Sequence, residues 1–261
     1  MTFDFEGKGV LVTGAAGAIG KGIAEGFLRG KAKVYITDYD PGAINATIAE
    51  LAPAGLCYGS AADVTRADDV QMVVDAAAKA LDGRIDILVN VAGVVAQGAV
   101  EDITAEEWDR VFSVNCKGSF LFIKHVVPMM KANSFGRIIN FSSKSGKTGS
   151  ALMAHYSAAK AAVIGMTQAL AYELADFGIN VNCLCPGITE NTGVWSSVSS
   201  GYVKNLSLPI DEVVKKFTAK VPLKRLARIK DVVAVTLFLA SEGGDYMTGQ
   251  AINVTGGREM H

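Results

Sequence analysis

The stretch VLVTGAAGAIGKGIA, residues 10–24, contains the three features that decide the fold: a strand, a turn and the start of a helix. Its apolar, β-branched beginning is typical of a buried strand, and its end has the composition of a helix. Glycines in the turn between them let backbone N–H groups approach a pyrophosphate, which the N-terminus of the following helix attracts. The alternative is a tight turn that binds nothing. The candidate contacts are Gly14, Gly17, Ala18, Ile19 and Gly20.

An acidic residue after the next predicted strand favours the binding interpretation. The run KVYIT at 33–37 predicts that strand, and Asp38 follows it, about twenty residues beyond the glycines. A carboxylate at this position accepts hydrogen bonds from the ribose hydroxyls of adenosine and repels a 2′-phosphate. We therefore expect NAD in preference to NADP, and the neighbouring Lys21 and Lys33 keep NADP as the alternative.

Short apolar runs alternate with helical patterns along the rest of the chain. Near-continuous apolar strands alternating with helices predict a parallel sheet that is covered by helices on both faces. We expect a single α/β domain over residues 1–261, a Rossmann-type doubly wound fold with about seven strands. The segment 188–212 lacks this pattern, so we expect a substrate loop or lid at about 188–218. The predicted strands lie at 9–13, 33–37, 55–61, 85–90, 137–141, 179–184 and 251–254.

Composition excludes several classes of protein. A formal net charge of -1 over 261 residues is unlike that of a protein that coats nucleic acid or an anionic membrane. Four cysteines lie in or beside apolar stretches without metal-ligand spacing, and the three histidines are scattered, so we expect no metal site. Unpaired thiols, no apolar leader and no long apolar run together predict a cytoplasmic protein.

Tyr156 and Lys160 lie four residues apart in HYSAAKAAV, a helix-forming stretch, so they share one helix face. Tyrosine has an ordinary pKa of about 10, and a neighbouring ammonium is expected to lower it toward neutrality. Ser143, just after the strand at 137–141, is placed to polarise a substrate oxygen. This trio suits hydride transfer, in which a cofactor performs the redox step and the protein moves a proton. The alternative is an amphipathic helix whose lysine extends to solvent.

These residues and further motifs resemble the short-chain dehydrogenase/reductase family over essentially the whole chain. The motifs are TGAAGAIG at 13–20, ADV at 62–64, NVAG at 90–93, NCKG at 115–118, CPG at 185–187 and YMTGQAINVTGG at 246–257. The resemblance implies an NAD(P)-dependent oxidoreductase that interconverts a secondary alcohol and a ketone, assembled as a homotetramer. It implies catalysis by Asn115, Ser143, Tyr156 and Lys160. The further cofactor contacts that it implies are Asp63, Val64, Asn90, Ala92, Gly93, Tyr156, Lys160, Pro186, Gly187 and Thr189.

The resemblance also implies a role for each catalytic residue. Tyr156 takes the hydroxyl proton during oxidation, and Ser143 fixes the substrate oxygen. Lys160 lowers the tyrosine pKa and holds the nicotinamide ribose, while Asn115 organises a water that carries the proton out. The sequence departs from the family pattern at three positions. These departures are Ala18 for the middle glycine of the turn, Val91 for the second asparagine of the NNAG motif, and Asn191 where a threonine is frequent, with Thr189 and Thr192 on either side.

A closer likeness within the family concerns the substrate. NFSSKSGKTGS at 140–150, VPLKR at 221–225 and the ending from 246 resemble bacterial sorbitol-6-phosphate 2-dehydrogenases, which implies sorbitol 6-phosphate and fructose 6-phosphate as reactants. A lysine could meet the phosphate, and aromatic residues could cover the substrate. Candidate substrate residues are Ser145, Lys144, Lys147, Trp195 and Lys204, with Tyr202 as a second cover.

Alternatives to that substrate remain open. Lys144 and Lys147 could simply be solvated lysines of a loop, as surface lysines usually are. The same chemistry would also suit a free polyol, a hydroxysteroid or a 3-ketoacyl thioester. A protein of another class, a dinucleotide sensor without catalysis, would keep the fold but would have no need of all four catalytic residues.

Overall fold

The computed structural model describes residues 3–193, 195–196, 199 and 209–261. Within them, the strands form one parallel sheet of seven strands in the order β3-β2-β1-β4-β5-β6-β7. The order reverses between β1 and β4, as in a doubly wound fold, so the predicted fold class is confirmed. The strands are β1 (Gly9–Thr13), β2 (Lys33–Asp38), β3 (Cys57–Ala61), β4 (Ile87–Asn90), β5 (Gly136–Phe141), β6 (Ile179–Pro186) and β7 (Ala251–Val254).

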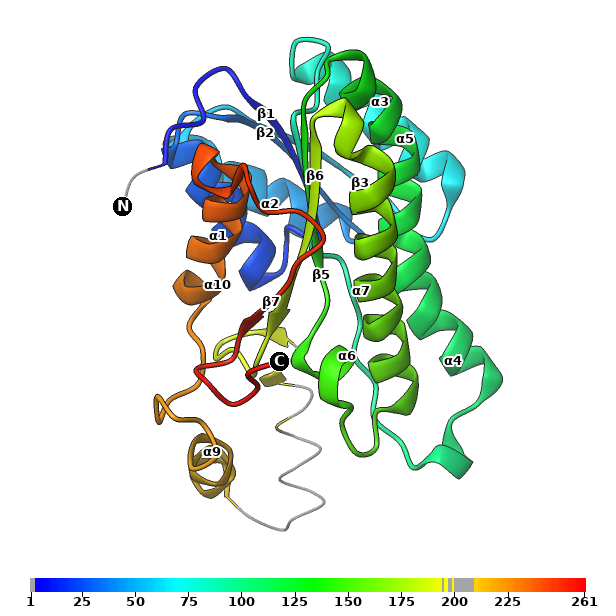
Figure 1. Cartoon of the computed structure of the whole chain (residues 1–261), viewed down its shortest axis with the longest axis vertical. Helices are drawn as coiled ribbons and strands as arrows, with labels where there is room; N and C mark the ends of the chain where they lie inside the picture. Colours follow the sequence, from blue (N-terminus) through cyan, green and yellow to red (C-terminus); the bar gives the residue numbers. More distant parts are fainter. Residues whose placement is uncertain (1–2, 194, 197–198, 200–208) are drawn as a thin grey trace.

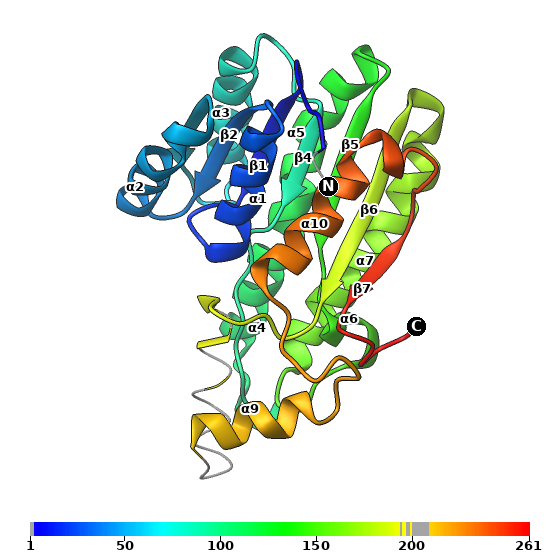
Figure 2. The ribbon, with the colours of Figure 1, turned by 90° about the vertical axis from the view of Figure 1, so that its left-hand side faces the viewer.

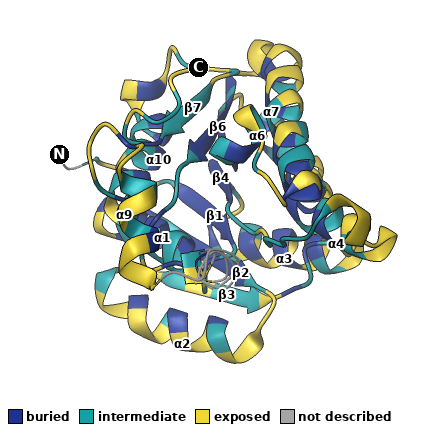
Figure 3. Cartoon of the chain, turned by 90° about the horizontal axis from the view of Figure 1, so that it is seen from below, coloured by how far each residue is buried: buried dark blue, intermediate teal, exposed yellow. Residues whose placement is uncertain are grey.

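Helices cover both faces of the sheet, which lies between them in Figure 2. One face carries α1 (Ala18–Arg29), α2 (Pro41–Leu51) and α10 (Ile229–Ala240). The other carries α3 (Ala67–Ala80), α5 (Gly118–Ala132) and α7 (Ala154–Leu174). Seen from below in Figure 3, the central strands are mostly buried, and the outer sides of the helices are exposed.

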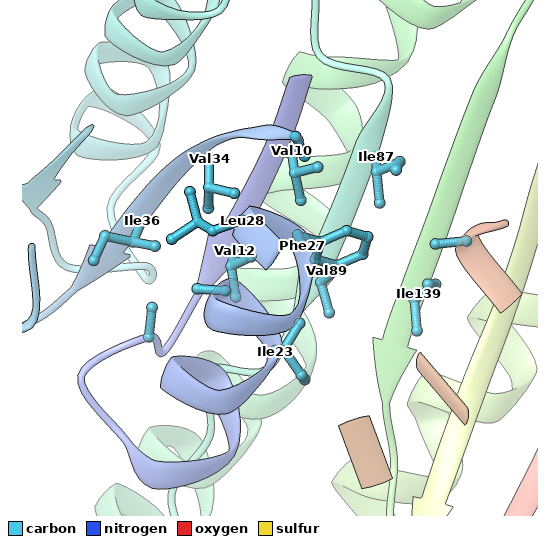
Figure 4. Packing of buried hydrophobic residues seen from close by; sticks show 14 of the residues in the cluster. Val10, Val12, Ile23, Phe27, Leu28, Val34, Ile36, Ile87, Val89 and Ile139 are labelled. Atoms are coloured by element: carbon cyan, nitrogen blue, oxygen red, sulfur yellow. The ribbon is translucent and has the colours of Figure 1, made fainter. Parts of the chain in front are cut away.

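Alternation along β1 shows why these residues form a two-sided core. Val10 and Val12 pack against α1, whereas Leu11 between them points to the opposite layer. In Figure 4, Phe27 and Ile23 of α1 lie against these strand residues. Burial of such a side chain contributes about 1.5–3 kcal/mol to stability. The apolar runs that predicted the strands therefore also hold the helices in place.

The sheet register aligns the carboxyl ends of the strands at one edge. Thr13 is level with Asn90, and Asn90 is level with Asn140. Connections that leave this edge include α6 (Lys144–Thr148), which follows β5, and α9 (Ile210–Thr218), which lies below the sheet in Figure 1. In open parallel sheets, ligands bind outside this edge.

Three local features go beyond the elements that the sequence predicts. α7 ends at Leu174 and is followed by a 3₁₀ turn, Ala175–Phe177, after which Gly178 takes a φ of 68°. Within the predicted loop at 188–218, α9 is an amphipathic helix that buries Val213. Between α4 (Ala105–Phe112) and α5 the chain forms a π-helical turn, Ser113–Lys117. None of the helices in the described part of the chain is long and apolar enough to cross a membrane.

Candidate active site

A cleft of about 1270 Å³ lies at the carboxyl edge of the sheet. Its turn end is lined by the glycine-rich turn after β1, by Asp38 and by Asp63. Its α6 end is lined by residues after β5 and β6, including Lys144, and by the side chain of Phe217 from α9. The predicted site residues that line this cleft are Gly14, Gly17, Ala18, Ile19, Gly20, Asp38, Asp63, Val64, Ala92, Gly93, Asn115, Ser143, Lys144, Ser145, Tyr156, Lys160, Pro186, Gly187, Thr189 and Trp195.

The structure places two candidates elsewhere. Asn90 is buried in the sheet, where its amide donates to Asn140 Oδ1 at 2.9 Å, and Asn140 in turn donates to Thr167 Oγ1 at 3.0 Å. Asn90 therefore links β4 to β5 rather than facing the cleft. Lys147 turns away from the cleft, because its ammonium donates to the Ala251 carbonyl of β7 at 2.6 Å.

Two further candidates, Lys204 and Tyr202, lie outside the described residues. Among the residues that are described, no group of three or more His, Cys, Asp and Glu side chains gathers as metal ligands would.

The glycine-rich turn approaches the end of β4 closely. Gly14 has a φ of 66°, and a Cβ there would lie 2.7 Å from the Ala92 Cα. A Cβ at Gly93 would lie 2.6 Å from Asn115 Oδ1 and 3.3 Å from Lys160 Nζ. Glycine at these positions lets the turn pack against the end of β4 and avoids a clash with Asn115 and Lys160. This cradle fits a ligand that lies against the turn and reaches Lys160, as a dinucleotide would.

Asp38 joins the end of β2 to the same turn. Its carboxylate accepts hydrogen bonds from the Ala16 N–H at 2.9 Å and the Tyr39 N–H at 2.7 Å. A carboxylate has about four acceptor positions, so it retains capacity for ribose hydroxyls. Asp63 is anchored in a similar way, because its carboxylate accepts from the backbone and hydroxyl of Thr65. Both acids are held by the chain before any ligand binds.

Lys160 and Tyr156 lie together in the middle of the cleft. Lys160 Nζ is 5.8 Å from the centroid of the Tyr156 ring and donates to the Phe141 carbonyl at 2.8 Å. Only 4% of Lys160 and 8% of Tyr156 is exposed. α7 supplies both residues, and their spacing of four places them on one face, as predicted.

Burial shifts the pKa values of Tyr156 and Lys160, and the shift of the Tyr156 pKa is opposite to the one predicted from the sequence. Burial raises the pKa of Tyr156, and the nearby Ser143 hydroxyl only partly opposes this rise. Burial also lowers the pKa of Lys160 to about 8, against the opposing effect of the thiols of Cys183, Cys185 and Cys116. The expected lowering of the tyrosine pKa is therefore not found in the chain alone, because a low-dielectric site disfavours the charged forms of both groups.

Asn115 lies in the π-helical turn between α4 and α5. Its Nδ2 donates to the carbonyls of Val94 at 2.8 Å and Val111 at 2.9 Å. Its Oδ1 is buried and has no hydrogen-bond partner among the described residues. An orphaned buried acceptor beside the cleft needs a donor, such as a water molecule. A π-helical turn changes the direction of the side chains that it carries and is frequent at functional sites.

At the α6 end, Ser143 begins α6 by accepting a hydrogen bond from the Ser145 N–H at 3.1 Å. Lys144 Nζ donates to Ser150 Oγ at 2.9 Å, and Ser145 Oγ lies 2.8 Å from the same oxygen. The half-buried Trp195 is fixed through its backbone N–H, which donates to Thr192 Oγ1 at 3.0 Å. These contacts build a wall of polar side chains that backbone N–H groups help to hold in place.

Several residues that line the cleft were not predicted from the sequence, among them Tyr39, Arg110, Phe217 and Arg258. Arg258 is the least expected of these, because it lies three residues from the end of the sequence. A signal was present in the pair Gly256-Gly257, which indicates a sharp turn just before it. Where this turn places the Arg258 side chain depends on tertiary structure.

Comparison with known proteins places the chain among oxidoreductases. A family profile described as enoyl-(acyl carrier protein) reductase matches residues 14–259. The chain is 38% identical to a sorbitol dehydrogenase of Cereibacter sphaeroides, with 98% of each chain covered. It is also 38% identical to a galactitol 2-dehydrogenase of Agrobacterium fabrum, with 97% of this chain and 98% of the relative covered. A sorbitol-6-phosphate 2-dehydrogenase of Escherichia coli matches at 38% identity over 78% of this chain and 79% of its own length.

Solved structures agree with these relatives. One from Brucella melitensis, described as a short-chain dehydrogenase/reductase of the glucose/ribitol dehydrogenase type, is 31% identical, covers 100% of both chains and has a TM-score of 0.89. A variant of actinorhodin polyketide ketoreductase with NADPH is 34% identical, covers 97% of this chain and 98% of its own, and has a TM-score of 0.93.

Proposed function

The chain belongs to the short-chain dehydrogenase/reductase family, and on that premise we propose that it interconverts a secondary alcohol and a ketone with NAD. The substrate that we propose is a sugar alcohol, preferentially its phosphate, with sorbitol 6-phosphate and fructose 6-phosphate as reactants. One observation carries the proposal: Asn115, Ser143, Tyr156 and Lys160 line the same cleft as the glycine-rich turn.

The cofactor would lie between the glycine-rich turn and Lys160. A bound nicotinamide dinucleotide supplies the redox chemistry, because its ring accepts or donates a hydride. In our proposal Asp38 binds the adenosine ribose and disfavours a 2′-phosphate, which favours NAD. The ketoreductase that was solved with NADPH shows that a similar protein binds the phosphorylated cofactor, so the preference needs a direct test.

The proton is handled by the chain itself. During ketone reduction the Tyr156 phenol donates its proton to the carbonyl oxygen, and during alcohol oxidation the phenolate takes the hydroxyl proton. A high pKa keeps Tyr156 protonated at neutral pH, which suits the reducing direction. The Ser143 hydroxyl donates to the same substrate oxygen. A water held by Asn115 Oδ1 would return the proton to Tyr156 through Lys160.

Two kinds of observation support a sugar alcohol as substrate. Relatives that match nearly the full length are named for sorbitol and galactitol, which are free polyols. The phosphorylated substrate is supported by Lys144 in the wall of the cleft and by the shorter match to a sorbitol-6-phosphate 2-dehydrogenase.

Steady-state turnover tests the proposal. The purified protein is mixed with sorbitol 6-phosphate or free sorbitol, each with NAD and with NADP, and nicotinamide absorbance is followed. We expect NAD-linked turnover of a polyol in the wild type and its loss in Tyr156→Phe. Binding of NAD without turnover of either polyol would contradict the proposed substrate class, and a preference for NADP would contradict the role given to Asp38.

A further inference from the structure

The last residues of the chain fold back along β7 and form what we call the C-terminal hook, residues 256–261. Asn253 Nδ2 donates to the carbonyls of Glu259 at 3.1 Å and His261 at 3.2 Å. Thr255 Oγ1 donates to the Glu259 carbonyl at 3.1 Å. Side chains of the last strand and the residue after it therefore fix the path of the hook.

Two glycines direct the hook toward the cleft. Gly256 and Gly257 have φ values of 65° and 89°, a conformation that other residues rarely adopt. A Cβ at Gly257 would lie 2.9 Å from the Pro222 Cγ, so the turn also packs tightly against the segment after α9. The chain end in Figure 1 accordingly lies near α6 rather than out in solvent.

The hook brings Arg258 into the wall of the α6 end. Its Nε is 3.1 Å from Glu259 Oε1, and its guanidinium carbon is 5.9 Å from the centroid of the Phe217 ring. The Arg258 side chain is 24% exposed, against 8% for Glu259. The guanidinium is thus held in a defined place, with part of its surface facing the cleft.

Arg258 shares the wall of the cleft with a second cation, Lys144. Burial and the positive charge of Arg258 lower the pKa of Lys144, and Glu259 acts in the opposite direction. Both cations line the cleft, whereas Glu259 is not among the residues that line it. The carboxylates that line the cleft within the described residues, Asp38 and Asp63, both belong to the turn end.

Among the described residues, Glu259 is the one carboxylate that opposes Arg258 and Lys144, so one positive charge at the α6 end is left for an anion in the cleft. Arginine offers a planar fork of donors, lysine adds a point charge, and a phosphate monoester carries about -1.5 to -2 at neutral pH. The hydroxyls of Ser145 and Ser150 beside Lys144 supply further hydrogen-bonding groups.

We propose that Arg258 and Lys144 form the subsite for a phosphate monoester on the substrate, so that the C-terminal hook selects phosphorylated over free sugar alcohols. The inference rests on the proposed function, because it takes the alcohol to be oxidised at Tyr156 in the same cleft. The proposal assigns substrate selection to Arg258, which lies near the end of the sequence, whereas the glycine-rich turn lies near its beginning.

Matched variants test the subsite. Arg258→Gln and Lys144→Gln remove the charges, and Arg29→Gln removes an exposed arginine of α1 far from the cleft. The quantity to measure is the ratio of kcat/KM for sorbitol 6-phosphate to that for sorbitol, with NAD. We expect this ratio to fall at least about tenfold in Arg258→Gln and in Lys144→Gln, because each loses a charge-assisted contact. The ratio should stay unchanged in Arg29→Gln. An unchanged ratio in Arg258→Gln would overturn the proposal.

Inorganic phosphate probes the subsite without the full substrate. It is expected to compete with sorbitol more strongly than acetate does at equal ionic strength, and to raise the melting temperature of the wild type more than that of Arg258→Gln. The subsite would be overturned if phosphate competed with sorbitol no more strongly than acetate does. It would also be overturned if phosphate raised the melting temperatures of the wild type and Arg258→Gln equally.

These outcomes separate the two proposals. Turnover of sorbitol at least equal to that of sorbitol 6-phosphate would overturn the subsite and leave the proposed oxidoreductase in place. No turnover of either polyol would contradict the proposed function, and the melting temperatures would then decide on the subsite alone.

Discussion

The two ends of the cleft are built differently. The turn end is made of strand ends and backbone: the glycine-rich turn, Ala92 and the anchored carboxylate of Asp38. The α6 end is made of side chains from segments far apart in the sequence, such as Lys144, Phe217 and Arg258. A backbone site suits a ligand that every member of a family shares, whereas a side-chain site can change from one member to the next. Changes at the turn end should therefore affect every substrate alike, and changes at the α6 end should alter the choice between substrates.

The largest effect is expected between the two ends, at Tyr156. Tyr156→Phe removes the proton donor and should lower turnover of every substrate by about 10²–10⁴-fold, while NAD affinity stays nearly unchanged. Turnover assays measure the first quantity, and a binding titration with NAD measures the second. Tyr172→Phe is the matched control, since Tyr172 is 90% exposed on the same helix. Comparable turnover in Tyr156→Phe and the control would remove Tyr156 from the mechanism.

The next largest effect concerns stability at Lys160. Its folded pKa of about 8 lies below its ordinary value of 10.5, so its charge destabilises the fold by about 3 kcal/mol at low and neutral pH. This destabilisation is complete below pH 8 and disappears as pH rises to about 10.5, where the unfolded chain also loses its proton. Lys160→Met should abolish activity yet raise the free energy of unfolding by up to about 3 kcal/mol at pH 7.

Denaturant unfolding across pH checks the sign of this effect. The advantage of the Lys160→Met variant over the wild type should shrink between pH 8 and 10.5. An advantage that grows with pH, or a variant less stable than the wild type at pH 7, would contradict the burial argument.

A smaller effect is expected from a single methyl group at the turn end. Gly14→Ala places a Cβ against Ala92 at a positive φ, so it should weaken NAD binding about tenfold, equivalent to a strain of about 1–2 kcal/mol. Gly165→Ala is the control, because nothing lies within 4 Å of a Cβ there, in the middle of α7. Gly14→Ala should lower kcat/KM for phosphorylated and free polyol alike. If it changed the ratio of these two kcat/KM values instead, the division between the two ends would be wrong.

The smallest effect is expected at Lys147. Lys147→Gln should leave the preference for a phosphorylated polyol within about twofold of the wild type, because this ammonium is bound to the Ala251 carbonyl outside the cleft. Measurement of kcat/KM on both polyols beside Lys144→Gln gives the comparison. A larger loss of preference in Lys147→Gln than in Lys144→Gln would reverse the assignment of the two lysines.

Sequence reasoning predicted best what depends on short spacing. The glycine-rich turn and Asp38 follow single strands, and the four-residue spacing of Tyr156 and Lys160 is enough to place both on one face of α7. The family resemblance placed Asn115 in the cleft, although its π-helical turn left no sign in the sequence.

What the sequence could not predict depends on tertiary contacts. Asn90 faces Asn140 because of the register between β4 and β5, and Arg258 lines the same cleft as Lys144 only because the hook folds back along β7. The direction of the Tyr156 pKa is set by burial, which a spacing of four residues does not show.

Transfer of an isotope label tests the central claim most directly. Sorbitol 6-phosphate is labelled with deuterium on carbon 2, the carbon that becomes the ketone of fructose 6-phosphate. It is mixed with NAD and the wild-type protein, and the reduced cofactor is analysed by mass spectrometry. Our account predicts that the deuterium appears in the cofactor, with slower turnover than for the unlabelled substrate when hydride transfer limits the rate. Deuterium released to water, or no reduced cofactor from a protein that binds NAD, would contradict it.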